Sequence, residues 1–209
     1  LVGRITVDDV MDEVREQAER DYQLASGLSQ DVETDDNVFR QTTARLPWLL
    51  IGMLGGIGNS MILGNFDTTF AAHPEMALYI PLIGGTGGNV GTQSSALVVQ
   101  GLANSSLNAE NTFKQVLKES VVAVINATII SMLVYIYNFI RFGATATVSY
   151  SVSISLFAVV MFASIFGTLV PMTLEKLKID PAIATGPFIS ITNDIIGMLM
   201  YMGITVLLS

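Results

Sequence analysis

The 209-residue chain has no cysteine and very few charged residues. The lack of cysteine excludes a disulfide framework, a thiol nucleophile and a thiolate metal site. Lys and Arg number only 10 and form no basic patch for phosphates, so nucleic acid is not expected as a partner. Charged residues make up 13% of the chain and hydrophobic residues 51%, whereas soluble domains are about a quarter charged. So few polar groups cannot cover a soluble domain, and the composition therefore excludes an ordinary soluble enzyme and points to a bilayer.

The charges that are present gather in the first 45 residues. This acidic head holds 11 acids and 5 bases, and the other 164 residues hold 7 acids and 5 bases. Residues 1–6 are predicted as a short strand. Asp8 and Asp9 then favour a helix start, because acidic side chains stabilise a helix N-terminus. One strand and one amphipathic acidic helix cannot bury a core, so we expect the head to be the tail end of a larger soluble domain.

Five long stretches carry almost no charge. They cover residues 46–66, 76–109, 120–140, 142–174 and 181–209. A helix needs about 20 apolar residues to cross the hydrocarbon core, and each stretch is long enough for one crossing. The sequence therefore predicts an all-α membrane protein with five transmembrane helices per chain, preceded by the acidic helix.

The basic residues predict the orientation of these spans. Cytoplasmic loops carry an excess of Lys and Arg. If the acidic head is cytoplasmic, Arg141 is the only base in the outer loops. The inner loops then hold Arg40, Arg45, Lys114, Lys118, Lys176 and Lys178. We therefore expect a cytoplasmic N-terminus and, with an odd number of spans, a C-terminus outside.

Asp194 is the only charged residue within these five stretches. A carboxylate near the middle of a membrane costs roughly 2.5–3.5 kcal/mol on insertion scales, so it should face a bundle interior or water. Helical spacing places it on one small, polar face. The members of this face are Gly186, Ser190, Asp194, Gly197 and Tyr201. Such a face suits a cation pathway. The alternative is that Asp194 is a protonated or hydrogen-bonded packing residue, with Asn193 as its partner or as a second polar group.

The second span contains a dense run of glycines and polar residues, GGTGGNVGTQSS at positions 84–95. Pairs of small residues four apart allow two helices to pack closely. Glycines also let the backbone distort, so that carbonyl groups and the side chains of Asn89 or Gln93 face a water-filled path. The run is not a phosphate-binding loop, because no Gly-Lys-Ser/Thr follows it. Both the packing and the pathway readings remain open from these residues.

Asp180 and the acids of residues 8–21 can each be interpreted as structural or as functional residues. Asp180 precedes Pro181 at the start of the last stretch, which favours an N-cap, although it also suits a cation-attracting pore mouth. The acids of residues 8–21 form a solvated helix face, or they bind hard divalent cations through oxygen.

Several motifs resemble the MgtE family of magnesium channels. They are LPWLL at positions 46–50, IPLIGGTGGNVGTQS at 80–94, DPA at 180–182, and the later Gly186, Pro187, Asp194 and Gly197. The start, LVGRITVDDV, resembles the end of that family's second CBS domain, and the following helix resembles its plug helix. The resemblance divides the chain into three parts. Residues 1–9 are the remnant of a CBS domain, residues 10–44 form the plug helix and linker, and residues 45–209 form the pore domain. It also implies a homodimer whose second and fifth spans line one pore on the two-fold axis.

The resemblance assigns roles to individual residues in the pore. Asp194 matches a carboxylate that holds hydrated Mg²⁺ between the two subunits. Gly186 and Ser190 match pore-lining positions, and Asn89 with its neighbouring glycine carbonyls faces the same ion. Asp180 matches an acid at the cytoplasmic mouth. These assignments agree with the chemistry of Mg²⁺, which gives up water reluctantly and prefers oxygen ligands.

The resemblance also implies regulation by the head. Asp9, Asp12, Glu16 and Asp21 match the acidic face of the plug helix, where cytosolic Mg²⁺ bridges repelling carboxylates and favours a closed state. Loss of that Mg²⁺ would let the acids separate and the pore open. The implied protein is a Mg²⁺-selective, Mg²⁺-gated channel of a prokaryotic inner membrane. Its implied partners are membrane lipid and N-terminal domains that are absent from this chain. Mn²⁺, Co²⁺ or Ca²⁺ are possible substitute ions.

Other functions remain as alternatives. A Na⁺- or H⁺-coupled Mg²⁺ carrier would use Asp194 to bind an ion or a proton in turn. An intramembrane aspartyl protease would need two close carboxylates that share a proton, and no second acid lies within the five stretches. A purely structural membrane anchor would not need Asp194. We therefore expect a transporter and not an enzyme.

Overall fold

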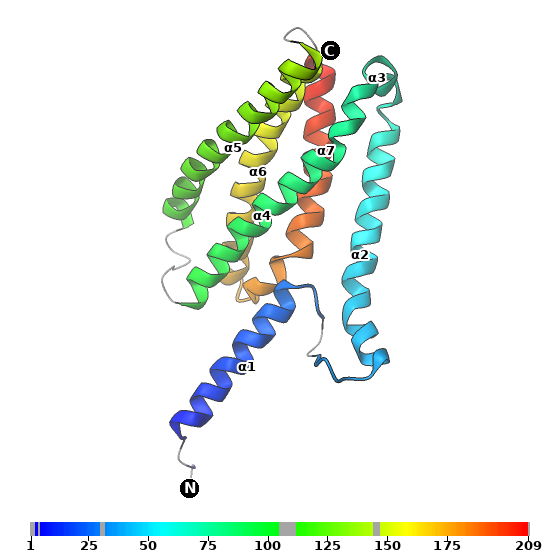
Figure 1. Ribbon diagram of the computed structural model, residues 1–209. Helices are drawn as coiled ribbons and strands as arrows, with labels where there is room; N and C mark the ends of the chain where they lie inside the picture. The colour runs from blue at the N-terminus through cyan, green and yellow to red at the C-terminus, as the bar shows by residue number, and fades with distance from the viewer. Residues whose placement is uncertain (1–2, 4, 30–31, 105–111, 144–146, 209) are drawn as a thin grey trace.

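The computed structural model describes residues 3, 5–29, 32–104, 112–143 and 147–208, and this part of the chain is helical with no strand (Figure 1). The helices are α1 Val7–Ala25, α2 Val38–Gly64, α3 Asp67–Ala72, α4 Ile80–Ala103, α5 Thr112–Phe142, α6 Thr147–Lys176 and α7 Pro187–Leu208. Two short 3₁₀ helices, η1 Pro74–Tyr79 and η3 Pro181–Ala184, precede α4 and α7. The all-α prediction is confirmed for these residues. The strand expected at the N-terminus is not formed by Gly3, Ile5 or Thr6, and its other residues lie outside the described ranges.

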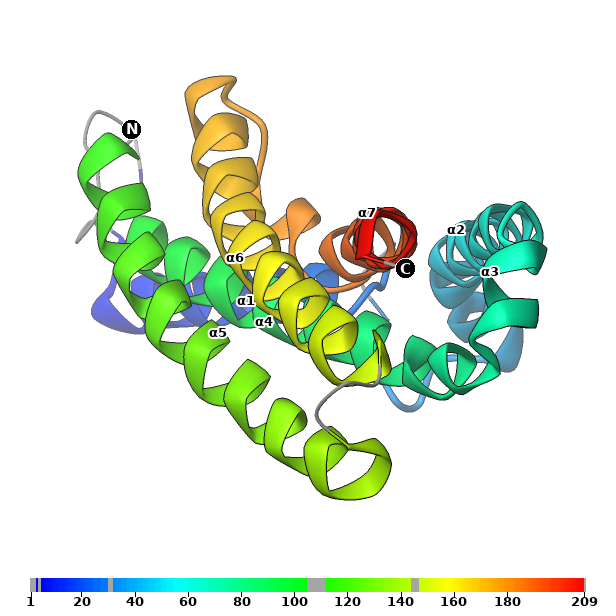
Figure 2. The same ribbon diagram turned by 90° about the horizontal axis from the view of Figure 1, so that it is seen from above.

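Helix α6 is the centre of the bundle. It packs against α4, α5 and α7, while α2 packs along α7. Figure 2 shows α6 between α5 and α7, with α2 on the far side of α7. The core is a cluster of apolar side chains from α4, α6 and α7. Its members include Ile83, Val152, Leu156, Val159, Val160, Tyr201 and Met202. Helix α1 has no buried residue and extends away from one end of the bundle (Figure 1).

Four of the five expected spans are long and apolar enough to cross a membrane. These are α2, α5, α6 and α7. Helix α4 has 24 residues, a sufficient length at about 1.5 Å per residue, but the glycines and polar side chains of residues 84–95 lower its hydropathy. The helices also differ from the expected stretches at their ends. Helix α1 begins at Val7 and α2 at Val38, so helices run across both domain boundaries predicted near residues 9 and 44.

Glycines bring α4 and α6 into backbone contact. A β-carbon at position 167 of α6 would overlap the carbonyl oxygen of Gly91 on α4. Position 91 is equally tight on its other side, because a β-carbon there would overlap the Asn193 side-chain amide of α7. The glycine run of α4 therefore permits close packing between three helices, which is the first of the two uses predicted for it.

Gly167→Ala should lower the thermal stability of the protein in detergent. The added methyl group must push α4 and α6 apart, and such overpacking costs about 1–3 kcal/mol. The midpoint of unfolding, followed by size-exclusion chromatography of heated samples, measures the effect. Gly203→Ala is the matched control, because Gly203 also lies in a helix interior but no atom is within 4 Å of the position that its β-carbon would take. Equal midpoints for the two variants would contradict the assignment of Gly167 to a helix crossing.

Candidate functional site

The carboxylate of Asp194 lies against bare backbone of α4. A β-carbon at Gly84 would be 3.5 Å from its Oδ1 atom, and one at Gly88 would be 3.4 Å from the same atom. Gly84 and Gly88 are one helical turn apart, so the carboxylate spans a turn of α4 that has no side chains on this side. Asp194 itself is only partly buried. The geometry thus places one acid against a turn of α4 that consists of backbone alone, with Gly84 partly buried and Gly88 buried.

Ser190 joins Asp194 in this site. It lies one turn earlier on α7, and a β-carbon at Gly88 would be 2.8 Å from its Oγ atom. Asn89 follows Gly88 on the exposed side of α4. The exposed side continues with Gln93, four residues later. The site therefore combines a carboxylate, a hydroxyl group and peptide groups, all of which offer oxygen ligands to a hard cation.

The polar face predicted around Asp194 is divided in the structure. Gly197 is buried, and a β-carbon there would be 3.3 Å from Val159. Tyr201 is fully buried, and its hydroxyl group donates a hydrogen bond to the Met76 carbonyl at 2.8 Å. These two residues pack the bundle and are not beside a solvent path. Ser190 and Asp194 share one side of α7, but the packing of α7 against α4 and α6 covers the C-terminal half of the predicted face.

Asn193 does not satisfy Asp194 by a hydrogen bond within the described structure. It is 1% exposed, and neither polar atom of its side chain has a partner among the described residues. Its side chain lies against the backbone of Gly91. The polar neighbour that the sequence suggested for Asp194 therefore belongs to the contact between α7 and α4.

Gly186 lies just before α7 and not on its face. Its φ angle is +60°, in the left-handed region that favours glycine, and a β-carbon would overlap the carbonyl oxygen of Ala25 at the end of α1. Gly27, with φ +81°, follows α1 and contacts the first residue of α7, since a β-carbon at Gly27 would be 2.6 Å from the Pro187 Cγ atom. Two glycines thus hold the end of the acidic helix directly against the start of α7. We call this contact the α1–α7 junction.

Asp180 caps η3 and not the last long helix. Its carboxylate accepts a hydrogen bond from the Ala182 backbone N–H at 2.8 Å, and α7 begins only at Pro187. The prediction that Asp180 is an N-cap is correct, but the helix that it caps is η3 and not the last long helix. Asp180 also lines a pocket of about 410 Å³ with Asp21 of α1 and Glu175 of α6. Of the predicted regulatory acids, Asp21 is thus the one that lies in a common pocket with the predicted mouth acid.

The other predicted acids lie along exposed α1. The Asp9 carboxylate accepts hydrogen bonds from the Thr6 backbone N–H and hydroxyl group at 2.8 and 2.7 Å, which lower the pKa of Asp9 below its ordinary 3.8. Deprotonated Asp9 therefore caps α1 at neutral pH, and this contribution is lost only as the pH falls through the lowered pKa. Glu16 is within 3.7 Å of Arg20, and Asp12 is exposed. The predicted helix start at Asp8 and Asp9 is confirmed.

Glu119 is a buried acid that the sequence reasoning missed. It lies in the second turn of α5 and is only 9% exposed. A signal was available, because small or polar residues follow it every four positions at Ala123, Ala127 and Ser131, which is the pattern of a buried helix face. Within the described ranges, no group of three or more His, Cys, Asp or Glu side chains is placed to hold a metal ion. A metal site at Asp194 thus needs ligands from water, backbone or a second chain.

Comparisons with known proteins show the family to which the chain belongs. Residues 80–204 match the MgtE family, described as a divalent cation transporter. The magnesium transporters MgtE of Bacillus subtilis and Thermus thermophilus are 34% and 31% identical to the chain over 204 and 214 residues. These matches cover 98% and 100% of this chain but only 45% and 46% of the relatives, so the chain spans less than half of their length. The matched range includes α4, Ser190 and Asp194. The chain therefore belongs to the MgtE family, a family of membrane transporters and not of enzymes.

Proposed function

We propose that the chain forms the membrane part of a Mg²⁺ channel in which Asp194 contacts the hydrated ion. The observation that carries the proposal is the position of its carboxylate against the side-chain-free backbone of Gly84 and Gly88, with Ser190 beside it. Mg²⁺ keeps most of its water, so a channel for it needs space and one or two carboxylates and not a full protein cage. The missing side chains let Asp194 and Ser190 approach the backbone of α4, and Asp194 supplies the charge. Gly186 and Asp180 would line the entry to this path.

The proposed channel is a homodimer with its pore on the two-fold axis. One chain contributes only one acid to the site, and a two-fold axis would double it. Asn89 and Gln93 support this arrangement, because both are exposed on α4. Exposed amide side chains in hydrocarbon are costly, so this side of α4 should face a second chain or water. In that setting α4 also crosses the membrane in spite of its low hydropathy, which brings the number of membrane-spanning helices to five.

The proposed orientation follows the positive-inside rule. The end of the bundle that carries α1 would be cytoplasmic, with Lys114, Lys118, Lys176 and Lys178 at that end, and the C-terminus would be outside. The membrane would be a prokaryotic plasma membrane. Ions would enter down the electrochemical gradient, since a negative cytoplasm attracts a divalent cation by about 2.3 kcal/mol per charge per 100 mV.

Helix α1 is the proposed regulatory element. Asp21 lines one pocket with Asp180, Glu175 and Lys178, where the three carboxylates are not placed to coordinate a bare ion together but would attract a hydrated Mg²⁺ ion. A cation in this pocket would reduce the repulsion between these acids and so stabilise the contact of α1 with α7 at the α1–α7 junction. Asp9, Asp12 and Glu16 would strengthen the effect as part of the same acidic helix. The head would belong to a CBS domain and further N-terminal domains of a longer protein.

Recordings from the protein in planar bilayers distinguish a channel from the Na⁺- or H⁺-coupled carrier. We expect discrete single-channel steps with Mg²⁺ as the charge carrier, because the site has no ligand set that would hold a dehydrated ion for long. Mg²⁺ flux should also continue in the absence of any Na⁺ or proton gradient. Smooth currents that vanish when both gradients are removed would overturn the channel and support the carrier.

A further inference from the structure

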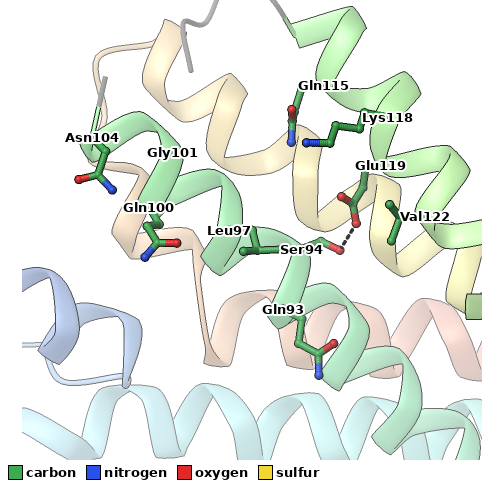
Figure 3. A pocket seen from close by; sticks show the side chains of 10 residues that line it. All are labelled: Gln93, Ser94, Leu97, Gln100, Gly101, Asn104, Gln115, Lys118, Glu119 and Val122. Carbon is green, nitrogen blue, oxygen red and sulfur yellow. Dashed lines mark hydrogen bonds between the residues drawn. The ribbon is translucent and has the colours of Figure 1, made fainter. Parts of the chain in front are cut away.

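A second polar pocket lies between α4 and α5, away from Asp194. It has a volume of about 370 Å³, within the range of about 300–1,000 Å³ that is typical of small-molecule sites. Figure 3 shows its side chains, with Gln115, Lys118 and Glu119 on α5, Gln100 on α4 and Asn104 at the C-cap of α4. Its lining residues lie near the C-terminal end of α4 and the N-terminal end of α5. Gln93, on the exposed side of α4, also lines it, whereas Asp194 and Ser190 do not.

The floor of the pocket is a buried carboxylate. One oxygen of Glu119 accepts hydrogen bonds from the hydroxyl groups of Ser94 on α4 and Ser164 on α6, at 2.6 and 2.5 Å. Both serines are at least nine-tenths buried, as is Glu119. None of the ion pairs of the described residues includes Glu119. Since a buried charge is normally paired, the pocket presents an anionic group that lacks a cationic partner.

The rim of the pocket carries the opposite charge. Lys118 precedes Glu119 on α5, and its exposed side chain extends toward α4 beside Gln115 (Figure 3). A bare cation would be attracted by Glu119 and repelled by Lys118, and a simple anion would meet the reverse. A ligand with one positive and one negative group satisfies both. The side-chain amides of Gln100 and Asn104 add neutral donors and acceptors between them.

Apolar residues connect the same pocket to the exposed surface of α4 and α5. Leu97 and Val122 line it and are 63% and 42% exposed. Both lie on the side of the pocket toward the middle of the helices, whereas Lys118 and Asn104 lie toward the helix ends. An amphipathic molecule in the bilayer would thus reach the polar part of the pocket with its headgroup and cover the apolar part with its chains.

We propose that this pocket binds the phosphoethanolamine headgroup of a membrane lipid. Its ammonium group would donate to the Glu119 carboxylate, and its phosphate would accept from the Lys118 ammonium. The bound lipid would hold the end of α4 against α5 through these charge-assisted hydrogen bonds. The inference does not depend on the proposed pore, because none of these residues contacts Asp194.

Native mass spectrometry of the detergent-purified protein with added lipids tests the proposal. Phosphatidylethanolamine should bind about tenfold more tightly than phosphatidylcholine, whose trimethylated amine cannot donate hydrogen bonds, and more tightly than anionic phosphatidylglycerol. Glu119→Gln should remove this preference, whereas Lys118→Gln should weaken the binding of phosphatidylethanolamine and phosphatidylcholine alike, because both lipids carry the phosphate. Lys114→Gln is the matched control, since Lys114 is also a base on α5 but does not line the pocket.

Three results would overturn the proposal. Equal binding of phosphatidylethanolamine and phosphatidylglycerol would exclude a zwitterionic ligand. Parent-like affinity for phosphatidylethanolamine in Lys118→Gln would exclude the phosphate contact, and this variant keeps the test decisive if loss of the buried Glu119 carboxylate impairs folding, because the Lys118 side chain is exposed. Free phosphoethanolamine that binds as tightly as the lipid would show that the pocket serves a soluble ligand.

Discussion

Asp194→Asn should abolish Mg²⁺ flux in proteoliposomes, with a reduction of at least about a hundredfold. Asparagine has nearly the same size, so it still fits against Gly84 and Gly88. It removes one charge per chain and two per proposed dimer from a site where a divalent ion must leave bulk water. A hundredfold loss corresponds to about 2.7 kcal/mol, a modest part of the attraction between a carboxylate and a divalent cation in a site of low dielectric constant. A Mg²⁺-sensitive dye inside the liposomes measures the rate.

Asp67→Asn serves as the matched control for this prediction. Asp67 is also an acid of the chain, but it is exposed in the first turn of α3 and far in sequence from α7. It should leave the flux within about twofold of the parent. Dimer formation, measured by light scattering, should be unchanged in both variants. A parent-like flux in Asp194→Asn would remove Asp194 from the ion path.

Much of this site could be predicted from the sequence because charge is so scarce in the spans. Asp194 was identifiable from its isolation alone, and the glycines of α4 from their density. Helical periodicity places residues on a common face but does not say which neighbour covers that face. Tyr201 illustrates this limit, because its hydroxyl group is used by the Met76 carbonyl, a partner 125 residues away.

Glu119 shows a second limit, which concerns helix ends. It follows Lys114 and Lys118, so it resembles a residue of a polar loop next to an apolar stretch. Helix α5 in fact begins at Thr112, and at this position the face of the helix turns Glu119 toward Ser94 and Ser164. Sequence alone does not show that these two serines converge, since they lie on different helices.

Gly186→Ala should weaken inhibition by internal Mg²⁺. Alanine is disfavoured at φ +60°, and its β-carbon would overlap the Ala25 carbonyl oxygen. The variant must therefore separate α1 from the start of α7, which disrupts the α1–α7 junction that we propose for the closed state. A loss of about 1–3 kcal/mol in coupling corresponds to an increase of about 5- to 150-fold in the half-inhibitory concentration. Currents recorded at a series of internal Mg²⁺ concentrations provide this value.

Gly27→Ala tests the same junction from the other side. Its φ angle is +81°, and a β-carbon would be 2.6 Å from the Pro187 Cγ atom, so it should shift inhibition in the same direction as Gly186→Ala. Gly58→Ala is the matched control, because no atom lies within 4 Å of a β-carbon at this position of α2. A shift in Gly186→Ala alone would indicate a local effect on the entry of α7. Unchanged inhibition in both junction variants would mean that α1 does not control the pore through this contact, since both substitutions separate the same two segments.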